Sequence, residues 1–134
     1  MSNKNRLVVS TDRIAQLRVE LAEYPTALEA LAEIEDCEGD LEDAAIALAI
    51  RAGQQPDRSD GWLEGLAKRC RARLCVQEPV RQSLAQGAIA ATLGYLDDQP
   101  PCPAVLLLPV VLWVSHQGVE TFCRPLDRPN LPES

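Results

Sequence analysis

Aromatic residues are scarce in this chain, and their scarcity bears on the fold class. Phe, Trp and Tyr account for 4% of the 134 residues, whereas Ala and Leu are the commonest residue types. Sheets usually draw on aromatic and β-branched residues, while Ala and Leu lose little on entering a helix. The composition therefore argues against a sheet and predicts an all-α protein whose helices pack closely through small side chains.

Positive charge is also in short supply. The chain has 13 Lys and Arg residues against 20 Asp and Glu, which gives a net charge of −7. A nucleic-acid backbone would be repelled by this excess, which argues against nucleic acid as a partner. The main basic cluster consists of Lys68, Arg69, Arg71 and Arg73, with Arg81 downstream. We interpret it either as the solvated face of an amphipathic helix or as a docking patch for an acidic partner or nucleic acid.

Motifs for cofactor and metal chemistry are missing. The chain has no CxxC pair, no glycine-rich phosphate loop and no EF-hand pattern, and its one histidine, His116, stands beside Ser115. Zinc sites need closely spaced Cys and His residues, and adjacent residues on a helix point in different directions. We therefore predict no catalytic residue, no metal ligand and no cofactor. The alternative is a small metal- or thiol-dependent enzyme that uses acidic residues or a Cys–His pair.

Cysteine usage and the N-terminus bear on the compartment. The cysteines are Cys37, Cys70, Cys75, Cys102 and Cys123. Their odd number, their apolar helical surroundings and a polar N-terminus without the apolar core of a signal peptide argue against a disulfide framework. We expect free thiols packed in the core of a cytoplasmic protein. The apolar run 104–114 is shorter than the roughly 20 residues of a membrane span, so no membrane association is predicted.

Apolar periodicity and capping residues predict a compact bundle of about six helices. The first helix is capped by Ser10 and ends near residue 23, and Pro25 ends it or opens the second, over 26–36. Gly39 stops the second helix, Asp40 caps the third, and Gly53 ends it. The third helix is apolar around much of its circumference and should lie centrally.

Three longer helices are expected in the second half of the chain, over 61–76, 79–96 and 104–123. Ser59 or Asp60 is the candidate cap of the first of them, and Pro109 restarts or kinks the last. We interpret residues 1–123 as one helical domain with a candidate subdivision near 54–61. A flexible, proline-containing tail is expected over 124–134.

The segment 26–53 resembles the second half of a UBA-type three-helix bundle. The matching residues are Leu28, Leu31, Gly39, Asp40, Glu42, Ala44, Ala45 and Leu48. The resemblance covers about a fifth of the chain and implies three short, tightly packed first helices, although Glu-Tyr-Pro-Thr replaces the usual glycine-containing loop. The whole chain is also similar to small all-helical cyanobacterial proteins, through its EIEDCEGDLEDAAIALAIRAG block, its Trp-Leu-x-x-Leu-Ala-Lys-Arg-Cys-Arg block and its Gly-Val-Glu-x-Phe-Cys ending. That similarity implies no activity.

Because no catalytic or metal site is predicted, the charged surfaces are the candidate binding sites. The acidic cluster comprises Glu33, Asp36, Asp40, Glu42 and Asp43, with Glu35 and Glu38 nearby. We predict a non-catalytic adaptor or regulatory domain that binds another protein through this cluster and through the basic residues 68, 69, 71 and 73. An obligate homodimer with an interface on part of 105–114 is a further alternative.

Overall fold

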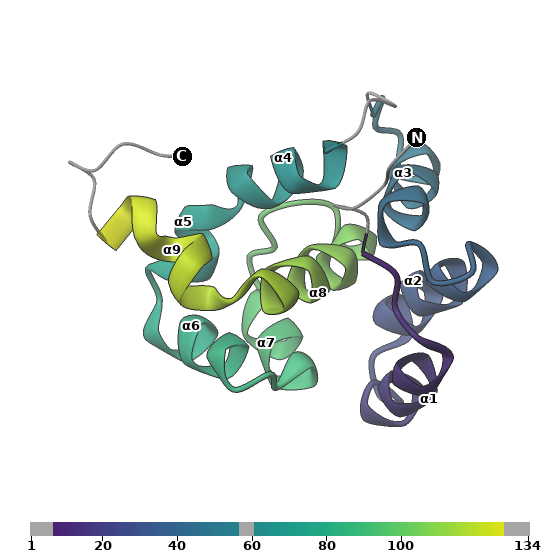
Figure 1. Cartoon of the computed structure of the whole chain (residues 1–134), viewed down its shortest axis with the longest axis horizontal. Helices are drawn as coiled ribbons and strands as arrows, with labels where there is room; N and C mark the ends of the chain where they lie inside the picture. Colours follow the sequence, from purple (N-terminus) through teal and green to yellow (C-terminus); the bar gives the residue numbers. More distant parts are fainter. Residues whose placement is uncertain (1–6, 57–60, 128–134) are drawn as a thin grey trace.

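Every regular element of the chain is a helix in the computed structural model, which describes residues 7–56 and 61–127 (Figure 1). The all-α prediction is therefore confirmed for these residues. The elements are α1 Thr11–Glu20, α2 Pro25–Asp36, α3 Leu41–Arg51, α4 Trp62–Arg69, α5 Arg71–Cys75, α6 Glu78–Ala85, α7 Ile89–Leu96, the 3-10 turn η1 Ala104–Leu106, α8 Leu107–Gln117 and α9 Val119–Asp127.

The first three helices begin where local capping chemistry predicts. The Ser10 hydroxyl accepts a hydrogen bond from the Arg13 N–H at 3.1 Å, and α1 follows directly. Pro25 is the first residue of α2, where its missing N–H costs no hydrogen bond. The Asp40 carboxylate accepts from the Asp43 N–H at 2.9 Å at the start of α3. These contacts span three residues of sequence, so the sequence alone specifies them. Ser59 and Asp60 lie outside the described residues.

Each of the three long helices expected in the second half is divided. The chain turns at Cys70 between α4 and α5, at Gly87 between α6 and α7, and at Gly118 between α8 and α9. Both glycines have positive φ, +72° and +96°, a conformation that costs glycine little and ends a helix. Ala104–Gln117 and Val119–Asp127 are bent by 91° to one another. The described residues thus hold nine α-helices, and the expected count of about six was too low.

The centre of the molecule is α8, which packs against α2, α3, α4, α6, α7 and α9 (Figure 1). Pro109 is the third residue of α8 and causes no break, because the first turn has no intrahelical acceptor for its N–H. Nearly all of residues 105–114 are buried inside the chain itself, with Val105 and Trp113 only half-buried. A homodimer would therefore need another surface. The third helix, α3, is also largely buried, but α8 occupies the position predicted for it.

Length and apolar composition decide which of the described helices could span a membrane. No single helix there is both long and apolar enough to cross a bilayer. Only the bent pair of α8, with its preceding turn, and α9 reaches the required length and composition together. Most of the apolar residues of α8 face the protein core.

Candidate binding surface at the α2–α3 turn

The predicted acidic cluster gathers where α2 turns into α3, but two of its members are engaged inside the molecule. The Glu33 side chain is 12% exposed, forms an ion pair with Arg51 and accepts a hydrogen bond from the Cys37 thiol at 3.5 Å. Glu42 reaches across to α4, where its carboxylate accepts from the N–H groups of Trp62 at 2.8 Å and Leu63 at 3.2 Å. Glu42 thus caps α4 from another helix.

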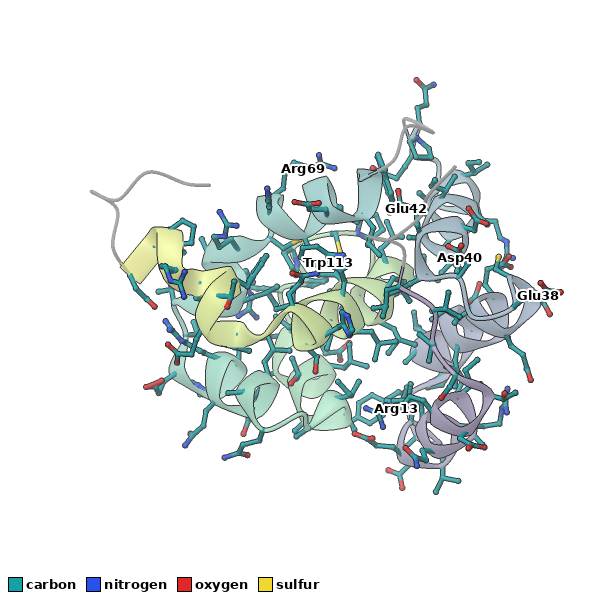
Figure 2. The ribbon with its side chains drawn as sticks, viewed as in Figure 1. Arg13, Glu38, Asp40, Glu42, Arg69 and Trp113 are labelled. Atoms are coloured by element: carbon teal, nitrogen blue, oxygen red, sulfur yellow. A yellow bond between two sulfur atoms is a disulfide. The ribbon has the colours of Figure 1, made fainter. Side chains whose placement is uncertain are left out.

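Three carboxylates of this region point outward, and we call them the acidic corner: Asp36, Glu38 and Asp43. Figure 2 shows Glu38 at the outer edge of the molecule, on the far side of α3 from α4. The pKa of the half-buried Cys37 thiol is raised by burial and then by the charges of Asp43, Asp40 and Asp36. The thiol therefore reports a negative potential at this corner, because a thiolate is disfavoured beside carboxylates.

The backbone at Glu38 adopts the left-handed conformation, with φ +57°. The Gly39 N–H donates to the Ile34 carbonyl and the Glu38 N–H to the Glu35 carbonyl, at 2.8 and 2.9 Å. This double hydrogen bond is the Schellman motif, in which glycine usually occupies the left-handed position. Of the non-glycine residues that the structure describes, Glu38 alone has positive φ.

The same motif ends two other helices, and both of those use glycine. After α3, Gly53 (φ +84°) donates to the Ile50 carbonyl at 3.1 Å, and after α6, Gly87 donates to the Leu84 carbonyl at 3.0 Å. The following residue completes the motif in each case, with bonds from Gln54 to Ala49 and from Ala88 to Ser83. Only at the acidic corner does a charged residue take the glycine position.

Sequence reasoning missed Glu38 as a site residue because it took Gly39 as the stop of α2. Gly39 in fact occupies the next position, where a Cβ atom would lie 2.3 Å from the Val9 carbonyl oxygen. The chain before α1 fixes this turn, since the Val9 N–H donates to the Gly39 carbonyl at 2.8 Å and the Leu41 N–H donates to the Leu7 carbonyl at 3.0 Å. Two adjacent residues with positive φ could be placed only once this contact was known.

The predicted basic cluster does not form one surface. Lys68 pairs with Glu64 at 3.0 Å, one turn back on α4. The guanidinium of Arg71 lies over the Phe122 ring, 4.9 Å from its centre, which is a cation–π contact. Arg69 is exposed on α4 (Figure 2).

Arg73 has a structural role between α5 and the end of α7. Its guanidinium donates to the carbonyls of Gln99 at 3.0 Å and Tyr95 at 3.1 Å and also bonds to the Gln77 side chain. The side chain is 17% exposed and lies 3.7 Å from the Asp98 carboxylate. Arg73 therefore holds the turn after α7 against α5 and is not presented to a partner.

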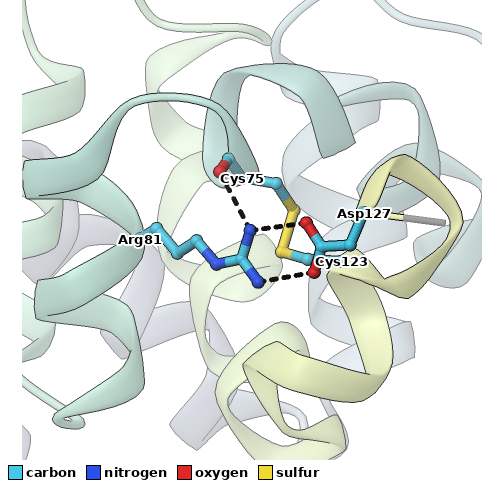
Figure 3. A network of polar contacts seen from close by, with 4 residues as sticks. All are labelled: Cys75, Arg81, Cys123 and Asp127. Atoms are coloured by element: carbon cyan, nitrogen blue, oxygen red, sulfur yellow. Dashed lines mark hydrogen bonds and ion pairs between the residues drawn. A yellow bond between two sulfur atoms is a disulfide. The ribbon is translucent and has the colours of Figure 1, made fainter.

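Arg81 fastens α9 to α6, as Figure 3 shows. Two guanidinium nitrogens donate to the two carboxylate oxygens of Asp127 at 2.9 and 2.7 Å, and one also reaches the Cys75 carbonyl at 3.4 Å. The forked pair raises the pKa of Arg81 through the hydrogen bond to Asp127. The helix α9 extends to Asp127 and so includes residues 124–127, the first part of the predicted tail. Residues 128–134 lie outside the described part of the chain.

Two of the five cysteines form a disulfide, which corrects the prediction of free thiols throughout. Cys75 on α5 and Cys123 on α9 are bonded, with their Cα atoms 5.7 Å apart (Figure 3). They are 48 residues apart in sequence and meet only because α5 packs on α9. Cys37, Cys70 and Cys102 are free.

The next question is whether the described residues form a cluster suited to catalysis or metal binding. Residues 7–56 and 61–127 contain no group of three or more His, Cys, Asp or Glu residues that could hold a metal ion. His116 is exposed in the last turn of α8. A small open pocket of about 260 Å³ lies beside the start of α2, where Tyr24, Asp97 and Leu107 are among its lining residues.

Comparisons with known proteins add no relative. No family model, no curated protein and no solved structure matches the chain. The fold and surface define an all-α protein with a charged turn, and the resemblance of residues 26–53 to UBA-type bundles stays a prediction.

Proposed function

We propose that the protein is a non-catalytic interaction domain that binds the basic surface of another protein through its acidic corner. The observation that carries the proposal is Glu38, a charged residue in a left-handed position where the two equivalent motifs of the same molecule have glycine.

Glu38 should lower the stability of the free protein in three ways. The left-handed conformation is strained for a residue with a side chain. A carboxylate at the C-terminal end of α2 faces the negative end of the helix dipole. Asp36 and Asp43 add like charges nearby. Within the described structure, the Glu38 carboxylate has no hydrogen bond or ion pair that would compensate. Strain of this kind is concentrated at binding and catalytic sites, and a basic partner would supply the missing counter-charge.

The acidic corner is a better binding surface than the basic cluster because its charges point outward. Arg71 and Arg73 are held against Phe122 and the turn after α7, and Lys68 is paired with Glu64. Arg69 is left as a single outward charge of the predicted basic cluster. Withdrawing these arginines for a partner would break internal contacts, whereas Asp36 and Glu38 are exposed at the acidic corner.

The test compares two variants that each remove one negative charge. Glu38→Gln removes one charge from the corner and keeps the side-chain length, while Glu120→Gln removes one exposed charge from α9, a helix that lies away from the α2–α3 turn (Figure 1). Wild type and both variants are used as bait in quantitative affinity purification from native extract, at low and at high salt.

We expect a partner that wild type and Glu120→Gln retain equally and that Glu38→Gln loses. With the purified partner, Glu38→Gln should raise Kd by roughly threefold to tenfold, and added salt should weaken binding of wild type more than of this variant. Equal retention by all three baits, or binding that salt does not affect, would overturn the proposal.

A further inference from the structure

The pocket of about 260 Å³ lies where three parts of the chain meet. Its walls come from the turn between α1 and α2, from the end of α7, and from η1 with the start of α8. The Glu20 carboxylate, at the end of α1, accepts a hydrogen bond from the Ala90 N–H of α7 at 3.0 Å and so joins two of these parts. Pockets between packed helices are common positions for small-molecule sites.

The floor of the pocket is apolar. It consists of the buried lining residues Ala27, Leu93, Leu107 and Leu108. An apolar group that enters the pocket would therefore leave water and contact hydrocarbon. Small-molecule sites usually enclose roughly 300–1,000 Å³, so a pocket of about 260 Å³ suits a ligand with a single ring or a short branched chain.

The rim of the pocket is negatively charged. Glu23 lies in the α1–α2 turn and Asp97 directly follows α7, and both side chains are exposed. Within residues 7–56 and 61–127, neither carboxylate has an ion pair or a hydrogen bond. None of the described residues that line the pocket is Lys, Arg or His. The rim therefore carries two negative charges and favours a cation.

The helix ends at the pocket do not reverse this preference. The start of α2 is a positive helix end, but it amounts to only about half a charge, and its first residue, Pro25, has no N–H to offer an anion. Asp97 lies at the C-terminal end of α7, which is the negative end of that helix. Two full carboxylate charges outweigh these partial ones.

Tyr24 adds a neutral polar group to the same pocket. Its hydroxyl oxygen reaches α7, since a Cβ atom added at Gly94 would lie 3.4 Å from it. The side chain is half-buried, and its hydroxyl has no hydrogen bond to the part of the chain that the structure describes. A phenolic oxygen can accept a hydrogen bond from an ammonium group.

We propose that this pocket binds a small organic cation, a protonated amine joined to an apolar body of about one ring. The apolar body lies on the buried floor, and the ammonium group lies at the rim beside Glu23 and Asp97, where it donates to the Tyr24 hydroxyl. The site is separate from the acidic corner, because none of the three residues of that corner lines the pocket.

The experiment follows the amide chemical shifts of the isotope-labelled full chain by NMR at low salt. The probes are phenethylamine, phenethyl alcohol and phenylpropionate, which share one ring and carry a positive, a neutral and a negative group. We expect saturable shifts from phenethylamine at the amides that line the pocket. Phenethyl alcohol should bind roughly threefold to tenfold more weakly, phenylpropionate should not bind, and added salt should weaken binding of the amine.

Charge-neutral variants at the rim test the role of the carboxylates. Glu23→Gln and Asp97→Asn should each raise the Kd of phenethylamine by roughly twofold to fivefold, and the double variant should bind the amine no better than the alcohol. Both positions are exposed, so the variants should fold, which circular dichroism checks. Glu29→Gln is the matched control, because it removes an exposed charge of α2 that does not line the pocket.

Three results would overturn the proposal. The first is the absence of saturable shifts at the pocket, or their appearance at the acidic corner instead. The second is that phenylpropionate binds wild type as tightly as phenethylamine does. The third is that the double variant keeps the preference for the amine. Failure here is distinct from failure of the proposed function, because Glu38→Gln should bind phenethylamine like wild type.

Discussion

Replacing Glu38 by glycine should make the protein more stable, against the usual direction of a glycine substitution. The residue has φ +57° in a Schellman motif at the end of α2. A left-handed residue with a side chain costs about 1–2 kcal/mol, which glycine relieves. Glycine also increases the entropy of the unfolded chain, which lowers the free energy of unfolding by about 0.5–1 kcal/mol. Removal of the charge from the negative end of α2 adds about 0.3–1 kcal/mol in favour of the variant.

These contributions sum to a gain of about 1 kcal/mol, or roughly 3–5 °C in Tm for a chain of this size. Urea unfolding without reductant, followed by circular dichroism, measures the gain while the disulfide stays intact. Glu38→Ala separates the causes, because it removes the charge and keeps the strain of a left-handed Cβ. It should therefore gain less than Glu38→Gly.

Two glycine-to-alanine substitutions make the reverse change, because each adds a Cβ atom at a residue with positive φ. Gly53→Ala places a Cβ atom where nothing lies within 4 Å, so it should cost only the backbone strain, about 1–2 kcal/mol. Gly39→Ala would set a Cβ 2.3 Å from the Val9 carbonyl oxygen and should cost more than about 3 kcal/mol. The reasoning is refuted if Glu38→Gly is neutral or destabilising while Gly53→Ala loses stability as expected.

Three further perturbations test other parts of the structure. Glu42→Ala removes the carboxylate that caps α4 from α3 and should cost about 1–2 kcal/mol in urea unfolding; a cost near zero would contradict this role. Cys123→Ala breaks the bond to Cys75 and should cost about 2–4 kcal/mol, so an unchanged unfolding midpoint would argue that the bond contributes nothing. Cys37 has a raised pKa in the folded protein, so its stabilising effect is present below the ordinary thiol pKa and is lost as pH rises through the folded value. At pH 8 iodoacetamide should therefore label Cys37 more slowly than a free thiol, and Asp43→Asn should raise the rate measured by mass spectrometry; an unchanged rate would exclude the charge effect.

The parts of the fold that were predictable are those set by neighbours in sequence. Ser10 and Asp40 cap α1 and α3 through the N–H three residues ahead, a contact that needs no tertiary structure. Gly53 ends α3 by adopting a left-handed backbone conformation, which glycine tolerates without help from distant residues. The break at Cys70 was not predictable, because apolar residues continue across it and no glycine or proline stands at it.

The location of the candidate site could be predicted from closeness in sequence, but the exposure of its individual residues could not. Acidic residues close in sequence around a turn must lie close in space, so the region of the acidic corner could be found without a structure. Which carboxylates point outward could not, because Glu33 and Glu42 are withdrawn by partners on distant parts of the chain. The basic residues were misread as one surface because Arg73 has its acceptors 22 and 26 residues away.

Composition, periodicity and capping residues by themselves determined that this chain is helical and where its first helices start. Tertiary structure alone decided which cysteines are bonded, which charges are exposed, and that Glu38 takes the position expected for glycine. The physical reason is range: a helix cap is closed within one turn, whereas a disulfide, an ion pair or a contact such as Val9 with Gly39 joins segments whose separation in the sequence says nothing about their distance.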